Sequence, residues 1–349
     1  SHTLIGFTLE SQFSTRSWRQ GGVSFRKGSR GASSLLRSLC RFAGFGIILG
    51  LSAEWANPEG LREQPRSEDQ KPTFRSSVTV VSVPCVVEGP QGFVDNLAVG
   101  DFQVFENGEP RPIEYFIFEG GEESRPMNLV LLLDTSGSVK GELNFEQEAA
   151  TTFLRNVLRP ETDMAAVVQF DSELYLVQDF TFDLQRLEDA VWTARAGGAT
   201  KLYDAVWVAV EDLLRHEVGR RVIVVLSDGD DTSSSVSSDS AIRKAQEYDV
   251  IIFGIGVRGR GFRSNFGKLK EFARETGGLF FNPRNRLDQL TEAFTALHSA
   301  LRHQYTLGYR SSPANGDSDY RRIEVKLKRK DLKGHCRQGY YPQGVTDGG

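Results

Sequence analysis

The sequence is poor in the residues that build zinc and iron–sulfur sites. Its 349 residues include three cysteines and five histidines, which are too few and too scattered to frame such a centre. Positive charge is not in excess either, because 42 Lys and Arg residues stand against 46 Asp and Glu residues, for a net charge of -4. A nucleic-acid partner requires a basic excess that neutralises its phosphates. We therefore expect no nucleic-acid binding.

A long apolar run is missing as well. The run from Phe42 to Ala53 contains about a dozen residues, whereas a helix that crosses a bilayer needs about 20, so we predict no transmembrane helix in the mature chain. Basic residues from Arg26 to Arg41 precede the run, and the small residues Ser52 and Ala53 end it, an order that is typical of a secretory signal.

Residues 1–53 are accordingly predicted to be a signal or targeting segment. The protein is then extracytoplasmic, that is, secreted, periplasmic or associated with the cell envelope. The alternative is a tail without a fold that ends in an amphipathic stretch.

The remaining chain divides into segments of different composition. Hydrophobic residues make up 39% and charged residues 25% of the sequence, as in ordinary globular proteins. Residues 54–73 are rich in proline and charge, which predicts a linker. Residues 74–121 carry β-branched runs and the turn signal Asn107-Gly108, which predicts a small β segment.

Residues 125–301 alternate between apolar runs and segments with helical periodicity. Met127–Leu133 and Val222–Leu226 are apolar runs with Asn128 as the one polar residue, and such runs are typical of strands buried on both faces. Helices between such strands predict an α/β fold with a Rossmann-like, doubly wound and mainly parallel sheet.

Residues 302–345 return to β patterns, and we predict that they pack with residues 74–121 in one β unit that flanks the α/β domain. Cys85 and Cys336 lie one in each half of this unit, and they are the cysteines that remain once residues 1–53 are removed. In an oxidising compartment they could form a disulfide. Two buried free thiols are the alternative.

A motif with chemical potential directly follows the first predicted strand of the α/β domain. Asp134, Ser136 and Ser138 occupy alternate positions of one tight loop, so that a carboxylate and two hydroxyls can point at one position. In a parallel α/β sheet, ligands bind beyond the carboxyl ends of the strands. Oxygen ligands with little charge suit Mg²⁺ or Mn²⁺ rather than zinc or copper.

Two further loops lie where the carboxyl ends of strands are expected. Gly197-Gly198-Ala199-Thr200 precedes a predicted helix, and Ser227-Asp228-Gly229-Asp230 follows the strand at Val222–Leu226. Together with the Asp-x-Ser-x-Ser loop, this set resembles the metal-ion-dependent adhesion site of von Willebrand factor A and integrin I domains. The resemblance covers about residues 125–300.

This resemblance implies a role for each residue. Ser136 and Ser138 would bind the cation directly, and Thr200 would do so when a ligand is engaged. Asp134 and Asp228 would act through water or as anchors behind the ligands. One coordination position would stay open for an Asp or Glu side chain of a protein partner. The domain would then be a metal-dependent adhesion module and not an enzyme.

The chain is also similar to a narrower group, the von Willebrand factor A-related proteins described from acidobacterial genomes. The similarity rests on the stretches Asp101–Gly108, Tyr305–Tyr309 and Gly339–Tyr341. It implies no specific biochemical role.

Plainer interpretations exist for the polar residues of these loops. Asp134 could simply cap the turn into the next helix. Asp230 and Asp231 are expected to be solvated loop charges, and Asp204 is expected to brace its loop. The serine-rich residues 233–238 are expected to form a flexible rim that ends in a helix cap.

Two other functions remain open. A haloacid dehalogenase-like phosphotransferase also places an Asp after its first strand, but it needs a second Asp two residues further on as general acid, and position 136 is Ser. A structural protein of the cell envelope, in which the metal only stabilises the fold, needs no partner.

Overall fold

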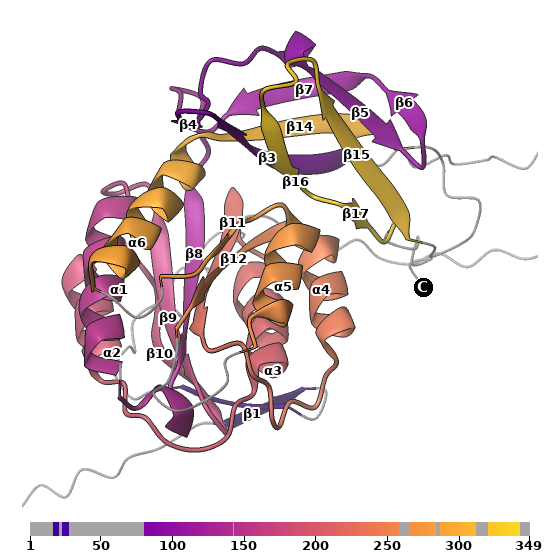
Figure 1. Cartoon of the computed structure of the whole chain (residues 1–349). Coiled ribbons are helices and arrows are strands. Elements are labelled where there is room, and N and C mark those ends of the chain that lie inside the picture. The colour runs from indigo at the N-terminus through magenta and orange to yellow at the C-terminus, as the bar shows by residue number, and fades with distance from the viewer. Residues whose placement is uncertain are drawn as a thin grey trace, which may run out of the picture. The chain divides into compact units, whose positions relative to one another are not determined.

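The structure is a computed structural model (Figure 1). It describes residues 17–20, 23–27, 80–141, 143–257, 265–283, 287–311 and 320–342. The predicted linker at residues 54–73 and most of the predicted targeting segment lie outside these residues. The described chain forms an α/β domain and a β sandwich.

The α/β domain is built on a sheet with the strand order β1-β2-β10-β9-β8-β11-β12-β13. From β9 to β13 in this order all neighbours are parallel, whereas β10 runs antiparallel to β9. This sheet confirms the predicted doubly wound, mainly parallel α/β fold. Its strands are β1 Ser17–Gln20, β2 Val23–Lys27, β8 Met127–Asp134, β9 Met164–Phe170, β10 Leu174–Thr181, β11 Arg220–Ser227, β12 Val250–Gly256 and β13 Phe280–Phe281.

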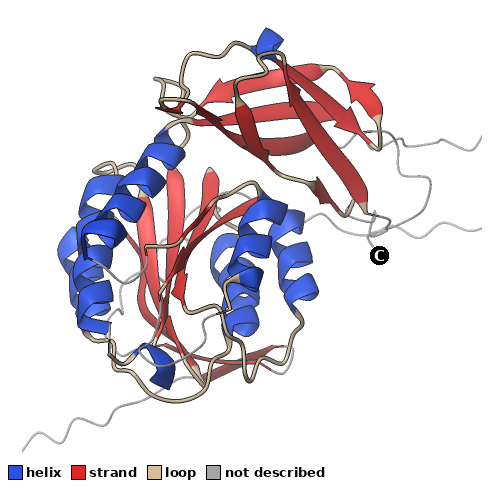
Figure 2. Ribbon diagram, in the orientation of Figure 1, coloured by secondary structure: helices blue, strands red, loops and turns tan. Residues whose placement is uncertain are grey.

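Helices cover both faces of this sheet (Figure 2). Helices α1, α2 and α6 pack on one face, and helices α3, α4 and α5 pack on the other. The helices are α1 Leu143–Val157, α2 Leu184–Trp192, α3 Leu202–Val208, α4 Ser238–Glu247, α5 Gly267–Thr276 and α6 Leu287–Arg302, with the short turns η2 Gly137–Val139 and η3 Ala209–Leu214.

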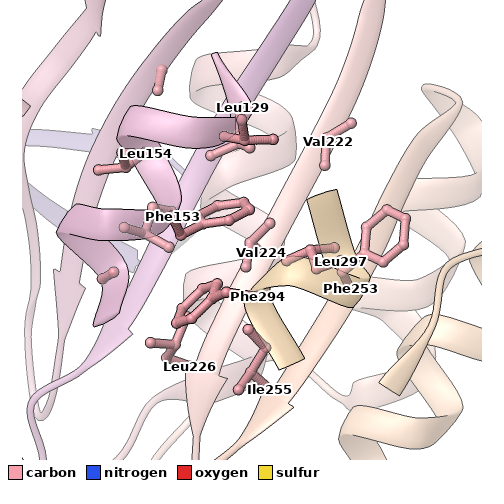
Figure 3. Packing of buried hydrophobic residues seen from close by; sticks show 14 of the residues in the cluster. Leu129, Phe153, Leu154, Val222, Val224, Leu226, Phe253, Ile255, Phe294 and Leu297 are labelled. Carbon is pink, nitrogen blue, oxygen red and sulfur yellow. The ribbon is translucent and has the colours of Figure 1, made fainter. Parts of the chain in front are cut away.

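Side chains of the central strands alternate between two hydrophobic cores, because successive residues of a strand point to opposite faces. In β8, Leu131 packs against α1, α2 and α6, and its neighbour Leu132 packs against α3, α4 and α5. Figure 3 shows the first of these cores, where Phe153 of α1 and Phe294 of α6 stack with ring centroids 4.8 Å apart. The strand is buried along its whole length, which explains the apolar run from Leu129 to Leu133.

The β sandwich combines strands that precede and follow the α/β domain. One sheet has the order β16-β3-β14-β7, with β4 paired to β3, and the second has the order β17-β15-β5-β6. Val83 of β3, Val104 of β5 and Tyr305 of β14 belong to one buried core between the sheets. The elements are β3 Val80–Gly89, β4 Gly92–Phe93, η1 Val99–Asp101, β5 Phe102–Glu106, β6 Glu109–Arg111, β7 Ile113–Phe118, β14 Gln304–Arg310, β15 Arg321–Leu327, β16 Lys333–Cys336 and β17 Gly339–Tyr340.

The sandwich is the β unit predicted from the N- and C-terminal segments, and the α/β domain is an insertion in it. The chain leaves the sandwich after β7 and returns at β14, and these two strands pair with each other in antiparallel fashion. Asn107 and Gly108 form the predicted hairpin turn between β5 and β6, both with positive φ.

A disulfide joins Cys85 of β3 to Cys336 of β16 across a sequence separation of 251 residues. The two residues face each other in the ladder between these strands, and both are buried. The bond therefore links the segment before the inserted domain to the segment after it.

A network of buried charged side chains links the two segments that connect the sandwich to the α/β domain. Glu119 follows β7, is fully buried, and accepts hydrogen bonds from Arg125 Nε at 3.0 Å and from Thr306 Oγ1 of β14 at 2.8 Å. Arg220 is at the start of β11. Its Nε lies 3.9 Å from Glu119 Oε2, and its Nη2 donates to Gln304 Oε1 at 2.5 Å. Burial lowers the pKa of Arg220 to about 10 despite the nearby Glu119 carboxylate.

Two strands of the sheet fall within the predicted targeting segment. Strands β1 and β2 pair with each other, and β2 runs parallel to β10 at the edge of the sheet. The targeting role of residues 1–53 stays a prediction. Among the described residues, no helix has the length and apolar character that crossing a membrane requires.

The first prediction concerns the disulfide. Replacing both Cys85 and Cys336 by Ser should lower the free energy of unfolding by roughly 2–5 kcal/mol, because the unfolded chain would lose a very long covalent loop. Urea unfolding of the variant and of the unaltered protein measures this loss. The unaltered protein in excess dithiothreitol should unfold like the variant, and coincident unfolding curves with and without reductant would contradict the prediction.

The second prediction concerns Glu119. Replacing it by Gln should lower the free energy of unfolding by about 3–5 kcal/mol, because Arg220 would stay buried without its carboxylate partner. Glu122, which is exposed in the same connection, gives a matched control, and its replacement by Gln should change stability by less than about 0.5 kcal/mol. Equal unfolding midpoints of the two variants would show that the buried network adds nothing.

Candidate metal centre

The candidate site lies at the carboxyl ends of β8 and β11, which are neighbouring parallel strands. Helix α1, which follows β8, covers one face of the sheet, and helix α4, which follows β11, covers the other. The winding of the sheet therefore reverses between these two strands. Ligands of doubly wound folds bind at such switch points.

Two buried carboxylates stand at these strand ends. Asp134 is 0% and Asp228 is 1% exposed. Asp134 accepts hydrogen bonds from the backbone N of Ser136 at 2.9 Å and from Ser227 Oγ at 2.6 Å, and Asp228 accepts one from the backbone N of Asp230 at 3.1 Å. Within the part of the chain that the structure describes, neither carboxylate forms an ion pair with a Lys or Arg side chain.

The electrostatic environment of Asp134 disfavours its negative charge. Burial raises the pKa of Asp134 to about 6, hydrogen bonds from Ser227 and Ser136 oppose this rise, and the nearby charge of Asp228 adds to it. Burial and Asp228 also raise the pKa of Asp230. A cation at this position would relieve the repulsion between the buried carboxylates.

Two hydroxyls lie beside the carboxylates, on the loop that follows β8. Ser136 is buried and Ser138 is half-buried, and their Oγ atoms are 2.9 Å apart. Octahedral Mg²⁺ holds its ligand oxygens at about 2.0–2.1 Å, so adjacent ligands lie about 2.9 Å from each other. The two hydroxyls therefore fit two adjacent positions of one such ion.

The second predicted loop is hydrogen-bonded to the first. The backbone N of Gly197 donates to Thr135 O at 2.7 Å, and the backbone N of Gly137 donates to Gly198 O at 3.2 Å. Thr200, at the end of this loop, is 4% exposed. The segment that continues the third loop is joined to it in turn, because Thr232 N donates to Thr200 O at 2.9 Å. The structure thus brings the three predicted loops together.

The donor set is rich in hydroxyls rather than in carboxylates. Over the described ranges, no group of three or more His, Cys, Asp or Glu side chains is arranged to hold a metal ion. A site here would consist of Ser136, Ser138 and Thr200 with Asp134 and Asp228 behind them. Neutral oxygen donors of this kind suit Mg²⁺ or Mn²⁺ and are poor ligands for copper.

The role of Ser227 was not assigned from the sequence. Its Oγ donates to Asp134 and accepts from Gly229 N at 3.0 Å, so it connects the ends of β8 and β11. The only signal in the sequence is its place before Asp228-Gly229. A bond between strand ends that are 93 residues apart leaves no local pattern.

The loop after β11 also differs from what was expected. Asp231 was expected to be a solvated charge, but its carboxylate accepts hydrogen bonds from Ser234 Oγ at 2.5 Å and from Tyr203 N at 3.3 Å. The serine-rich segment was expected to be a flexible rim, but Ser234 is bound to the start of α3. Ser237 caps α4 as predicted.

Gly229 is the residue that allows the third loop its shape. Its φ is +83°, and a Cβ at this position would lie 2.4 Å from the backbone O of Asn265. Both facts exclude a side chain without a shift of the backbone. The glycine therefore keeps the end of β11 close to the segment that precedes α5.

Comparisons with known proteins bear on the identity of the α/β domain. Residues 128–296 match the family model described as von Willebrand factor type A domain. An uncharacterized protein from Borreliella burgdorferi is 26% identical over 183 residues, which cover 44% of this chain and 53% of that protein. The chain thus spans about half the length of this curated relative.

Solved structures with a similar arrangement share little sequence with this chain. A von Willebrand factor type A protein from Catenulispora acidiphila is 14% identical, with 75% of each chain covered and a TM-score of 0.45. The von Willebrand factor domain of the type V pili tip protein Mfa5 from Porphyromonas gingivalis is 14% identical, with 51% of this chain and 96% of that chain covered and a TM-score of 0.43. Proximal thread matrix protein 1 from the mussel byssus, with a zinc-occupied MIDAS motif, is 16% identical, with 57% and 50% covered and a TM-score of 0.46.

The fold and the three loops define a doubly wound α/β domain with a polar site at the carboxyl ends of its central strands. The matched segment includes β8 to β13 and most of α6. Residues 128–296 are a von Willebrand factor type A domain, hereafter the A domain, as the sequence pattern predicted.

A third prediction follows from the shape of the loop after β11. Replacing Gly229 by Ala should lower the free energy of unfolding by about 1–3 kcal/mol, because Ala is strained at positive φ. Gly137 has no positive φ, and the nearest atom to its added Cβ is 3.7 Å away, so its replacement by Ala should cost less than about 0.5 kcal/mol. Urea unfolding measures both, and an equal effect would contradict the strain argument.

Proposed function

We propose that the A domain binds Mg²⁺, or Mn²⁺, and uses it to hold a carboxylate of a protein partner. Ser136, Ser138 and Thr200 supply the direct oxygen ligands, with Thr200 bound to the cation before a partner is engaged as well as afterwards. Asp134 and Asp228 supply negative charge behind them. The domain then acts as a metal-dependent protein-binding and adhesion module.

The observation that carries this proposal is the uncompensated charge of Asp134 and Asp228. Both are buried, and both are hydrogen-bonded to hydroxyl or backbone N–H groups rather than to a cation. Buried carboxylates require a compensating charge. The 2.9 Å separation of the Ser136 and Ser138 hydroxyls matches the spacing that a hard divalent cation requires.

The same donor set favours an acidic partner. Three neutral hydroxyls would leave much of the charge of a dication uncompensated, so a carboxylate from outside is attracted. Asp134 and Asp228 are held inward by Ser136 N, Ser227 Oγ and Asp230 N. They are therefore poorly placed to fill every coordination position themselves.

The type of domain and the sandwich support a protein-interaction role outside the cytoplasm. Domains of this type mediate protein–protein interaction, so the family of residues 128–296 supports protein binding as the general function. The disulfide between Cys85 and Cys336 fits an oxidising compartment, because such bonds are rare in the cytosol. We infer that the protein is secreted, periplasmic or attached to the cell envelope.

An enzymatic phosphoryl transfer is the weaker candidate. That chemistry needs a proton donor two residues after the first Asp, and Ser136 at this position is hydrogen-bonded to Ser138. We therefore propose that the protein is not an enzyme. A metal that only stabilises an envelope protein is the second candidate, because it shares the same ligands.

The fourth prediction tests the metal and the partner separately. Replacing Ser136 or Thr200 by Ala should weaken Mn²⁺ binding at least about tenfold, since removing a ligand should cost no less than removing the partner of a ligand. Isothermal titration calorimetry measures this. Ser172, which is exposed on a neighbouring turn, gives the control, and its replacement by Ala should leave the affinity unchanged.

Capture from a native extract of the source organism then decides between the two candidate functions. With Mg²⁺ present, the unaltered protein should retain a partner that EDTA releases and that Thr200→Ala does not hold. Metal binding without any EDTA-sensitive partner would favour the purely structural role. Unchanged Mn²⁺ affinity in Ser136→Ala and Thr200→Ala would overturn the metal site itself.

A further inference from the structure

We propose that residues 231–236, the clamp segment, fix the position of Thr200, with Ser234 and Asp204 as the positioning residues. This inference rests on the proposed metal site, because it concerns how one of its ligands is held. It assigns a function to the serine-rich stretch that follows the Ser-Asp-Gly loop.

The clamp segment contacts the backbone of Thr200 directly. Thr200 O accepts hydrogen bonds from the backbone N of Thr232 at 2.9 Å and of Ser233 at 3.0 Å. In the opposite direction, Thr200 N donates to Thr232 Oγ1 at 2.9 Å. Both polar backbone groups of Thr200 are therefore bound to the clamp segment, which leaves its side-chain hydroxyl for another partner.

The clamp segment also caps the helix that begins two residues after Thr200. The N-cap residue of α3 is Lys201, and no side chain at this position caps the helix. Instead, Ser234 Oγ accepts hydrogen bonds from the backbone N of Tyr203 at 3.1 Å and of Asp204 at 3.0 Å. The free N–H groups of a helix N-terminus need such acceptors. Here the acceptor comes from a loop about 30 residues away.

Asp204 closes the connection from the side of α3. It is fully buried, and its Oδ1 accepts hydrogen bonds from the backbone N of Ser235 at 2.8 Å and of Val236 at 3.0 Å. A charged acceptor makes such bonds stronger than a neutral one. The side chain of each residue thus accepts hydrogen bonds from the backbone of the other segment: Ser234 from the start of α3, and Asp204 from the clamp segment.

The arrangement couples the second and third loops of the site. Thr200 ends the second loop, and the clamp segment continues directly from the third loop, which carries Asp228. A displacement of the clamp segment therefore has to move Thr200 relative to Asp228 or break these hydrogen bonds. Partners that orient a metal ligand typically change metal affinity 10- to 100-fold when they are removed.

The experiment compares two neighbouring serines with different roles. Ser234→Ala removes the oxygen that caps α3, whereas Ser235→Ala removes an exposed hydroxyl and leaves the backbone donor to Asp204 in place. We expect Ser234→Ala to weaken Mn²⁺ binding about tenfold and Ser235→Ala to leave it within about twofold. Affinities are measured by calorimetry on the full chain, at a temperature where thermal unfolding shows that both variants are folded.

Asp204 provides a second test, which compares a variant that keeps an acceptor oxygen with a variant that removes it. Asp204→Asn keeps an oxygen that can accept from Ser235 and Val236, and it should retain more of the Mn²⁺ affinity than Asp204→Ala. Amide hydrogen exchange at Thr232 and Ser233 should accelerate in Ser234→Ala and Asp204→Ala, because these amides are bound to Thr200 O. That readout needs no metal.

The outcomes separate this inference from the metal site on which it depends. If the unaltered protein binds Mn²⁺ and Ser234→Ala binds it equally well, the positioning role is wrong and the metal site stands. A Ser234→Ala variant that loses thermal stability but keeps both affinity and amide protection would show a cap without a positioning role. Absence of Mn²⁺ binding in the unaltered protein would overturn the metal site and, with it, the ligand role of Thr200.

Discussion

The hydrogen bond from Ser227 Oγ to Asp134 Oδ2, at 2.6 Å, joins the carboxyl ends of β8 and β11, and the site is arranged around it. The parallel pairing of these strands brings the two residues to one edge of the sheet. Asp134 is thereby directed inward, and its second oxygen orders the Ser136 loop. Because the same hydroxyl accepts from Gly229 N, the loop after β11 is fixed from the same point.

The site concentrates negative charge where the fold excludes water. Asp134, Asp204 and Asp228 are all at most 1% exposed, and in the described residues each accepts hydrogen bonds from hydroxyl or N–H donors and none pairs with a basic side chain. This differs from the junction with the sandwich, where Glu119 lies among arginines. The described chain thus has two kinds of buried acid, one paired with arginines and one without a basic partner.

Much of the fold follows from patterns that are local in sequence. The apolar run at Leu129–Leu133 identifies β8 because a strand buried on both faces carries mainly apolar side chains. The turn at Asn107-Gly108 follows from the positive φ that both residues tolerate. Pro84 lies inside β3, although proline lacks the backbone N–H that a strand ladder uses. β3 continues through it, since the ladder with β16 ends at Cys85 and no hydrogen-bond partner is displaced there.

The arrangement of the candidate site was only partly predictable. The order of the three loops along the chain indicated which residues could converge. The bonds of Ser227, Asp231 and Ser234 join loops that are distant in sequence, and a run of serines by itself has the composition of a mobile segment. Ser227 finds its partner through the register of β8 and β11. Asp231 and Ser234 find theirs at the start of α3.

The insertion of the A domain in the sandwich has a mechanical consequence. Both connections leave from neighbouring strand ends, because Phe118 of β7 lies opposite Tyr305 of β14. A pull on the A domain would therefore reach the sandwich through β7 and β14 at once, and any displacement of β14 would have to break its hydrogen bonds to β3 or β7. Since β14 also pairs with β3, which is bonded covalently to β16, tension on β14 would pass into a strand that is cross-linked to its other neighbour.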